Sequence, residues 1–324
     1  MDLGRGCDLI CLRLFSSTIL FIMPELPEVE TIARGLAKRV TGDVIESVWV
    51  GNKKEPLKSP AAAIVAALEG RRILAVRRMG KHIVFDLEGG KHSPRTKSRP
   101  GPGRRRSSST LAAVAGGGAR STQASNAQWI VHLGMTGRML VCSAGDAIEK
   151  HTHLIAKLAS GRELRFVDPR RFGRLSVADS GNFEAGGIEP LEIDFERFAG
   201  LFRGRKTPIK SALLNQQLLR GVGNIYADES LFRAGIRPRR RATTIAREKL
   251  ALLHRSVQEV LKEAIALGGS SISDYVGADG KEGFFQLQHR VYGREGEQCL
   301  VCKTPVKRVV IAGRSSHYCP KCQK

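Results

Sequence analysis

The sequence predicts an α+β protein: an N-terminal antiparallel β-sandwich with flanking helices, then a helical domain that ends in a zinc-binding β-hairpin. Short runs of alternating apolar residues recur through the first half of the chain, as in half-buried strands. Between 246 and 267 the apolar residues recur every three or four positions, as in a helix with one buried face. Two Cys-x2-Cys pairs near the C-terminus complete the pattern.

The first element expected is a helix that begins at Pro24, over the segment PELPEVETIARGLAKRV. Acidic residues crowd its first turns, while Lys38 and Arg39 lie in its last turn, so both ends suit the helix dipole. Strands then follow, spaced as in an antiparallel sandwich; examples are residues 44–50, 82–87, 129–133 and 163–167.

Residues 89–128 interrupt the strands and are rich in Gly, Pro, Ser and Arg. They hold eight basic residues and no acidic one, a composition that cannot bury enough apolar surface to pack a core. We therefore expect a disordered insertion on a hairpin. After the segment GGIEP at 186–190 the apolar period becomes helical, which indicates the start of the second domain.

The charge of the chain indicates its partners. Its 324 residues include 53 Lys+Arg against 31 Asp+Glu, for a net charge of +22, and the chain stays strongly basic without residues 89–128. Such a surface favours polyanions, either nucleic acid or an anionic membrane. The longest apolar run, residues 9–22, is interrupted by Arg13 and polar residues and is too short to span a bilayer, so we expect no membrane partner.

Four of the seven cysteines form a cluster with the spacing of a metal site: Cys299, Cys302, Cys319 and Cys322. Two such knuckles can close a tetrahedral site, so we expect one structural Zn²⁺. Four thiolates leave no open position for water, and catalysis must lie elsewhere. The other cysteines are scattered, which favours a reducing compartment over a disulfide framework.

Two further segments carry possible chemistry. If the chain begins at Met23 and loses that residue, Pro24 becomes a free secondary amine, a nucleophile beside the carboxyl group of Glu25. Taken alone, the same residues are ordinary for the start of a helix. In LRGVGNIYA at 219–227, two glycines precede a helix on which Asn224 could cap or contact a phosphate, although such a motif is more often a plain turn.

Together, the motifs resemble one family. PELPEVET at 24–31, HLGMTGRM at 132–139, DPRRFG at 168–173, GVGNIYADESLF at 221–232 and the cysteine pairs are similar to those of the bacterial-type formamidopyrimidine-DNA glycosylases, in the helix–two-turn–helix superfamily. The resemblance spans nearly all of 23–324. It implies a DNA glycosylase and abasic-site lyase that removes oxidised purines, 8-oxoguanine and formamidopyrimidines, from double-stranded DNA.

The resemblance also implies roles for individual residues. Pro24 would form a Schiff base at the sugar C1′ and Glu25 would move the proton, followed by β,δ-elimination. Lys81, on its strand, would assist at the phosphate and in β-elimination, and Arg314 in δ-elimination. The DNA contacts implied are His151, Arg170, Arg205, Lys210 and Asn224. The space left by the everted base would be filled by Met135, Arg170 and Phe172, and the Gly-rich loop from 268 to 283 would close over that base.

The expected organisation follows: an extension at 1–22, either a misassigned start or removed; a catalytic β-sandwich domain at 23–186; a helix–two-turn–helix DNA-binding domain at 187–290; and a four-cysteine zinc finger at 291–324. We expect a monomer in a bacterial cytoplasm, with an organellar targeting role for 1–22 as the lesser alternative. Two other functions stay open: an endonuclease VIII-like glycosylase for oxidised pyrimidines, and a non-enzymatic zinc-finger DNA-binding protein if Pro24 is not N-terminal. Leu26 and the HLGMTGRM motif favour the purine branch.

Overall fold

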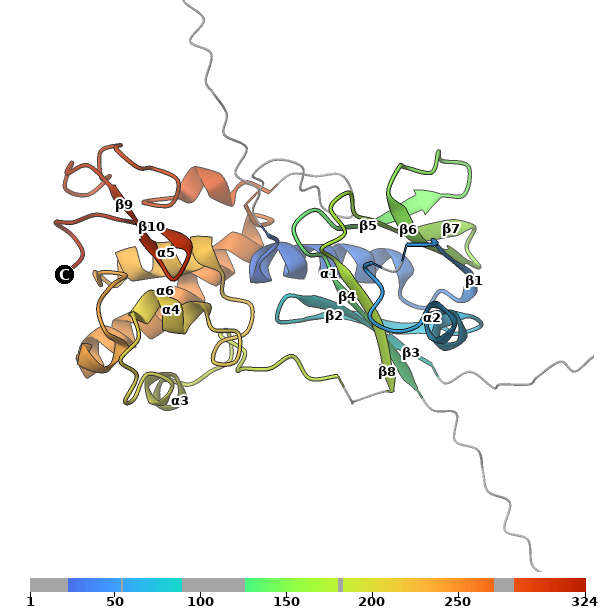
Figure 1. Cartoon of the computed structure of the whole chain (residues 1–324), viewed down its shortest axis with the longest axis horizontal. Helices are drawn as coiled ribbons and strands as arrows, with labels where there is room; N and C mark the ends of the chain where they lie inside the picture. Colours follow the sequence, from blue (N-terminus) through green and yellow to red (C-terminus); the bar gives the residue numbers. More distant parts are fainter. Residues whose placement is uncertain (1–22, 54, 89–125, 180–182, 271–282) are drawn as a thin grey trace, which may run out of the picture.

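The computed structural model describes residues 23–53, 55–88, 126–179, 183–270 and 283–324. Two domains lie side by side, a β-sandwich and a group of helices against which a small hairpin packs (Figure 1). The expectations for 1–22, for residues 89–125 of the insertion and for most of the loop from 268 to 283 lie outside the described residues.

Two four-stranded antiparallel sheets form the sandwich, as predicted. The first sheet has the order β1 (Ile45–Val50), β6 (Thr152–Leu158), β7 (Arg162–Val167) and β5 (Arg138–Ser143). The second has the order β2 (Ile73–Met79), β3 (His82–Leu87), β4 (Ala127–His132) and β8 (Arg174–Asp179). Alternate side chains of both sheets meet in one core, where the rings of Phe85 and Trp129 stack with centroids 4.7 Å apart.

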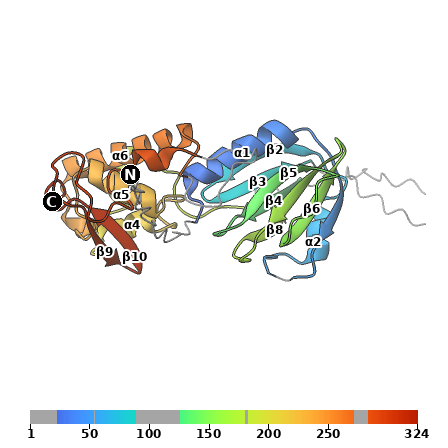
Figure 2. The same cartoon turned by 90° about the horizontal axis from the view of Figure 1, so that it is seen from above.

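The flanking helices are α1 (Leu26–Val40) and α2 (Ala61–Leu68). Helix α1 belongs to both domains: Leu26 lies in the helical core, whereas Val29, Ile32 and Leu36 lie in the sandwich core. Figure 2 shows the helix running from one domain across a sheet of the other. The start of α1 therefore lies where the domains meet.

The start of α1 and the end of the insertion differ from the prediction. Helix α1 begins at Leu26 with Glu25 as its N-cap, so Pro24 precedes the helix. This happens because the Glu28 carboxylate accepts the Glu25 N–H at 2.9 Å, which closes the first turn. The predicted insertion ended at residue 128, but Ala127 and Gln128 already belong to β4, where they pair with β3 and continue the ladder.

The second domain contains helices α3 (Phe195–Gly200), α4 (Ile209–Leu214), α5 (Asn224–Arg233) and α6 (Arg247–Ala266), with short 3-10 turns at Ala242–Thr244 and Phe285–Gln288. The long α6 presents Leu250, Leu253, Val257 and Val260 to the core, as its periodicity predicted. The C-terminal hairpin pairs β9 (Lys307–Ile311) with β10 (Arg314–Tyr318). Among the described residues, none of the helices is long and apolar enough to cross a membrane.

An ion-pair network joins the domains behind the start of α1. The Arg78 guanidinium, on β2, donates to Glu30 at 2.7 Å and to Glu189 of the second domain at 2.8 Å. Both Arg78 and Glu189 are buried, with side chains 7% and 8% exposed. Because breaking such a pair leaves an uncompensated buried charge, the network holds the two domains in one relative orientation.

Candidate active site

A cavity of about 550 Å³ lies between the two domains and the tip of the C-terminal hairpin. Residues from the sandwich domain, the helical domain and the hairpin line it, including Glu25, Lys81, His132, Asn224 and Arg314. Met23 and Glu25 both line the wall, so Pro24 lies between two lining residues. The fold thus brings Glu25 and Arg314 to one cavity although 289 positions separate them in the sequence.

The side chain of Glu25 lies at the N-terminus of α5. The backbone N–H of Asn224, the first residue of that helix, donates to Glu25 Oε1 at 2.6 Å. The other oxygen, Oε2, has no hydrogen-bond partner among the described residues. Burial raises the pKa of Glu25 to about 7, with Glu28 adding to the rise and Lys81 opposing it. Glu25 can therefore hold or release a proton near neutral pH.

Gly223 makes room for that carboxyl group. A Cβ atom at Gly223 would lie 1.9 Å from Glu25 Cδ and about as close to both oxygens. Its φ of −126° is open to any residue, so close approach and not backbone conformation requires glycine here. The first glycine of the motif, Gly221, has φ of +89° and approaches Leu26 in the same way.

A second buried carboxylate supports the first. Glu28 accepts hydrogen bonds from the backbone of Glu25 and Ser270, at 2.9 Å and 2.8 Å, and from the Tyr226 hydroxyl. Burial raises the pKa of Glu28 in spite of these donors. Its bonds tie the start of α1 to α5 and to the segment after α6, so Glu28 orients the backbone that carries Glu25.

Lys81 and His132 form the sandwich side of the cavity. Lys81 lies in the turn between β2 and β3 and not within a strand. Burial lowers the pKa of Lys81, although Glu25 favours its charged form. Burial also lowers the pKa of His132 to about 4, which keeps its ring neutral, and its Nδ1 accepts the Gly134 N–H at 3.0 Å. Sequence reasoning did not single out His132; its position within HLGMTGRM was the available signal.

The tip of the finger supplies another part of the cavity lining. The β9–β10 turn passes through Ala312 and Gly313, both with positive φ, and places Arg314 at the cavity as an exposed side chain. Next to it, the Ser315 hydroxyl accepts a hydrogen bond from the Asn224 side chain at 3.3 Å. Arg314 and Asn224, predicted from different motifs, therefore share one site.

Lys210, which the resemblance assigned to a phosphate contact, has a fully buried side chain. Its Nζ is 2.7 Å from Asp228 Oδ1 and donates to the carbonyl oxygen of Ser315 at 2.6 Å. Burial lowers the pKa of Lys210 and Asp228 opposes that shift. In this structure Lys210 therefore anchors β10, and with it Arg314, against α4 and α5.

The remaining DNA-contact candidates lie outside the cavity lining. Arg170 and Phe172, on the β7–β8 loop, are exposed, and the Arg170 guanidinium lies 4.9 Å from the Phe172 ring centre. Met135, on the β4–β5 loop, is half-buried. His151 and Arg205 are exposed, the first at the start of β6 and the second after α3. These side chains are accessible to a large ligand at the edge of the sandwich and of the helical domain.

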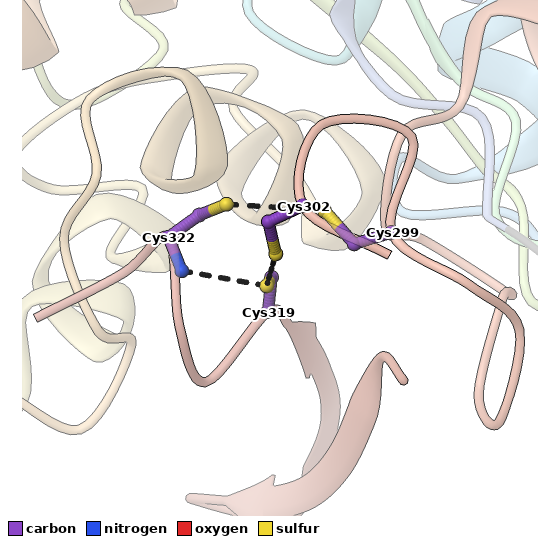
Figure 3. Close-up of side chains that lie close together, drawn as sticks. All are labelled: Cys299, Cys302, Cys319 and Cys322. Carbon is purple, nitrogen blue, oxygen red and sulfur yellow. Dashed lines mark hydrogen bonds between the residues drawn. The ribbon is translucent and has the colours of Figure 1, made fainter. Parts of the chain in front are cut away.

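The four predicted cysteines meet in one cluster at the base of the finger (Figure 3). Their sulfur atoms all lie within 4.8 Å of one another, with 3.4 Å between Cys302 and Cys319 and 3.9 Å between Cys299 and Cys322. Tetrahedral Zn²⁺ with bonds near 2.3 Å places its sulfurs about 3.8 Å apart. The residues thus fit one zinc ion, which would close the finger, and four thiolate ligands would leave it no open position for water or substrate.

The architecture is that of the helix–two-turn–helix class of zinc-finger proteins. Residues 23–175 match the formamidopyrimidine-DNA glycosylase N-terminal domain, residues 187–276 the helix–two-turn–helix domain of the same enzymes, and residues 296–324 the zinc finger found in them and in isoleucyl-tRNA synthetase. The chain belongs to the formamidopyrimidine-DNA glycosylase family.

Named relatives agree with this assignment. Formamidopyrimidine-DNA glycosylase of Solibacter usitatus is 44% identical over 93% of this chain and its own full length, and that of Thermus thermophilus is 41% identical, with 93% and 98% covered. The crystal structure of MutM (Fpg) from Thermus thermophilus has a TM-score of 0.74 at 39% identity, covering 93% of this chain and 98% of that one. Lactococcus lactis Fpg bound to DNA containing Fapy-dG has a TM-score of 0.75 at 30% identity, covering 93% and 100%.

Proposed function

We propose that the protein excises oxidised purines from double-stranded DNA and cleaves the abasic site that results. The observation that carries this proposal is the state of Glu25. One oxygen of its carboxyl group has no partner among the described residues, the group lies on the cavity wall directly after Pro24, and burial raises its pKa to about 7. An acid with these properties, next to a nucleophile, is what base removal requires.

The substrate class comes from the relatives. One solved structure with a TM-score of 0.76 and 30% identity is MutM bound to DNA that contains carbocyclic 8-oxo-G, and the Lactococcus lactis protein holds Fapy-dG. Both lesions are oxidised purines. The same substrates suit this chain because its cavity and flanking loops are built from the corresponding motifs.

Pro24 would act as the nucleophile when it is the first residue of the chain. The match to the family begins at residue 23, which agrees with a mature chain that starts at Pro24. The lone pair of its secondary amine is available to attack C1′ of the lesion nucleotide, whereas the lone pair of an amide nitrogen is delocalised into the carbonyl group. The bond from C1′ to the base then breaks, and Glu25 moves the proton that this step requires.

Lys81, from the sandwich, and Arg314, from the finger, both line the cavity at this centre and would serve the later steps. The C1′–O4′ bond of the sugar then breaks, with a proton passed to O4′, and this ring opening turns the adduct of Pro24 at C1′ into an iminium. The iminium acidifies the neighbouring sugar carbon C2′, so loss of a proton there expels the 3′ phosphate. A second elimination expels the 5′ phosphate. Cationic side chains stabilise both leaving phosphates, and Lys81 and Arg314 both line the cavity.

Base eversion assigns a role to the loops at the edge of the sandwich. Taking a base out of the stack costs a few kcal/mol and leaves a space to fill. We assign this space to Met135, Phe172 and Arg170, the last also contacting the unpaired partner base. His151, Arg205 and Asn224 would contact the backbone. The catalytic domain is then 23–186, the helix–two-turn–helix domain 187–290 and the finger 291–324, working on DNA in the bacterial cytoplasm.

Borohydride trapping tests the proposal. The chain that begins at Pro24 should form a covalent complex with a duplex containing 8-oxoguanine opposite cytosine, because borohydride reduces the iminium to a stable amine. The full chain, with a verified intact N-terminus, should trap little, since its Pro24 nitrogen is an amide. Efficient trapping by that full chain would contradict the assignment of Pro24 and point to Lys81.

A substrate panel separates this proposal from the pyrimidine branch. The same protein should release 8-oxoguanine and formamidopyrimidine faster than thymine glycol or 5-hydroxycytosine in matched duplexes. The reverse order would identify an endonuclease VIII-like activity. Binding without release of any base would support a non-enzymatic DNA-binding protein.

A further inference from the structure

The buried carboxylate of Asp168 bonds to both loops that carry the filling side chains Met135, Arg170 and Phe172. Asp168, directly after β7, has no solvent exposure. Its Oδ1 accepts the Thr136 hydroxyl at 2.6 Å and the Arg170 N–H at 3.2 Å, and its Oδ2 accepts the Gly173 N–H at 2.7 Å. The carboxylate thus bonds at once to the β4–β5 loop and to two points of the β7–β8 loop.

The backbone of Asp168 reaches a third loop. Its N–H donates to the carbonyl oxygen of His151 at 3.0 Å, and its own carbonyl oxygen lies 2.9 Å from Nε2 of His153. His151 has φ of +71°, a left-handed conformation that costs free energy in a residue other than glycine. The bond from Asp168 helps to hold this conformation next to the other two loops.

The β4–β5 and β7–β8 loops, here called the filling loops, contact each other through their backbones next to this carboxylate. A Cβ atom at Gly134 would lie 2.5 Å from the Phe172 carbonyl carbon and 2.6 Å from the Gly173 nitrogen. One at Gly173 would lie 2.5 Å from the Phe166 ring and 3.1 Å from Asp168 Oδ2. The loops therefore have little room to move separately while the Asp168 bonds persist.

We propose that Asp168 is a positioning residue that holds Met135, Arg170 and Phe172 in the arrangement that enters the DNA stack. This inference rests on the proposed function, because it takes the filling role of those side chains from it. A side chain that replaces a base must keep its place against the restacking of the duplex. Loops that are already ordered lose less conformational entropy when they enter the DNA stack. The hydrogen bonds that the Asp168 carboxylate accepts from these loops, here called the clamp, therefore favour eversion of the base.

Four variants separate the clamp from general folding. Asp168→Asn keeps the shape but replaces one acceptor oxygen by an N–H₂ group, which then faces either Gly173 or both Thr136 and Arg170. Thr136→Val removes, at constant size, a hydroxyl that donates to Asp168 and accepts the Arg170 N–H at 3.3 Å, and Thr136→Ser restores it. Asp86→Asn makes the same chemical change in the other sheet, at a carboxylate that pairs with Arg77 at 2.6 Å and bonds to no filling loop. If Asp168→Asn does not fold, the Thr136 pair still tests the clamp.

Amide hydrogen exchange of the zinc-loaded protein tests the clamp without any substrate. At least one of the Arg170 and Gly173 amides should exchange at least about tenfold faster in Asp168→Asn, because they bond to different carboxylate oxygens and the amide side chain keeps only one acceptor oxygen. Thr136→Val should give a smaller increase, and Thr136→Ser and Asp86→Asn none. Unchanged exchange in Asp168→Asn would overturn the proposal, and this outcome does not depend on whether the protein excises bases.

Single-turnover kinetics test the consequence. With all variants given the same N-terminus, Asp168→Asn should slow release of 8-oxoguanine from a duplex by about 10- to 100-fold. Cleavage of a ready-made abasic site in single-stranded DNA should change less than about twofold, because no stack has to be opened. In a Met135→Ala, Phe172→Ala background, the Asp168→Asn effect should shrink to less than about threefold.

Two outcomes contradict the inference while leaving the proposed function intact: equal slowing on both substrates, or an undiminished effect when the filling side chains are absent. Each would make Asp168 a general stabiliser of the sandwich. Failure of the unmodified protein to release the base would instead contradict the proposed function. In that case the hydrogen-exchange experiment by itself would still test whether Asp168 orders the two loops.

Discussion

The amide of Asn224 donates to Oε1 of Glu25 across 2.6 Å, although 199 residues separate the two in the sequence. This bond joins the start of α1 to the start of α5 and places a carboxyl group where the helix dipole favours negative charge. Burial nevertheless dominates and raises the pKa of Glu25 to about 7. A residue held this way is rigid in position and divided between its two protonation states at neutral pH.

The pH dependence of base release should therefore show the titration of Glu25. If Glu25 acts as an acid, the single-turnover rate falls as pH rises through about 7, the value to which burial raises its pKa. Glu25→Gln should abolish release and retain binding to the lesion duplex. A pH profile that is flat between about 6 and 8 would contradict an acid or base role for this residue.

The same pKa shift makes a prediction for stability. A carboxyl group whose pKa is raised on folding stabilises the protein at low pH, where it is protonated. For Glu25 this contribution is lost as the pH rises from 4.5, the ordinary pKa of the group, through about 7, its pKa in the folded protein. Glu25→Gln should therefore have a higher free energy of unfolding than the parent at about pH 8, by about 1–3 kcal/mol, and a similar one near pH 4. Urea unfolding at the two pH values measures this; an equal difference at both would contradict it.

Gly223→Ala should displace the carboxyl group without unfolding the protein. The new Cβ would lie 1.9 Å from Glu25 Cδ, so either Glu25 or the start of α5 must move. We expect base release to slow by about 100-fold, as for other misplacements of a reacting group by an ångström. Gly200→Ala is the matched control, because nothing lies within 4 Å of a Cβ there. Equal activity of the two variants would show that the site tolerates this shift.

Removal of zinc should weaken DNA binding and leave the sandwich folded. Cys299→Ser should bind no zinc and lose at least about tenfold in affinity for a lesion duplex, because Arg314 is no longer held at the cavity. Both tryptophans, Trp49 and Trp129, lie in the sandwich, so tryptophan fluorescence reports that domain alone. A fluorescence spectrum typical of unfolded chain would show that the finger is needed for the whole fold.

Lys210→Met should destabilise the protein because it leaves the buried Asp228 carboxylate without its lysine partner. Among the described backbone donors, only the His317 N–H, at 2.8 Å, would still bond to that carboxylate. The expected loss is about 3–5 kcal/mol in the free energy of unfolding, and adding Asp228→Asn should recover much of it. Urea unfolding of the single and double variants measures both. If Lys210→Met instead keeps full stability but lowers DNA affinity and its salt dependence, Lys210 contacts phosphate as the family resemblance implied.

The local elements were predictable because their signals are local. Helix α6 was visible as apolar residues at three- and four-residue intervals, and the strands as alternation, because those periods place side chains on one buried face. The cysteine spacing predicted the zinc site for the same reason, since two ligands separated by two residues close a knuckle by themselves. The predicted start of α1 was wrong. Proline suits the first turn of a helix, so the pattern placed the start at Pro24. The hydrogen bond from the Glu25 N–H to Glu28 instead makes Glu25 the N-cap, and the helix begins at Leu26.

The sequence alone determined which motifs are present, hence the family and its chemistry, because motif residues are read without knowing where they lie in space. Only the tertiary structure decided that Lys210 is buried against Asp228, that His132 lines the cavity, and that Asp168 joins three loops. These relationships connect distant segments, and whether a side chain is exposed or buried depends on what packs against it. Burial then sets the pKa of Glu25, a property that the order of residues does not contain.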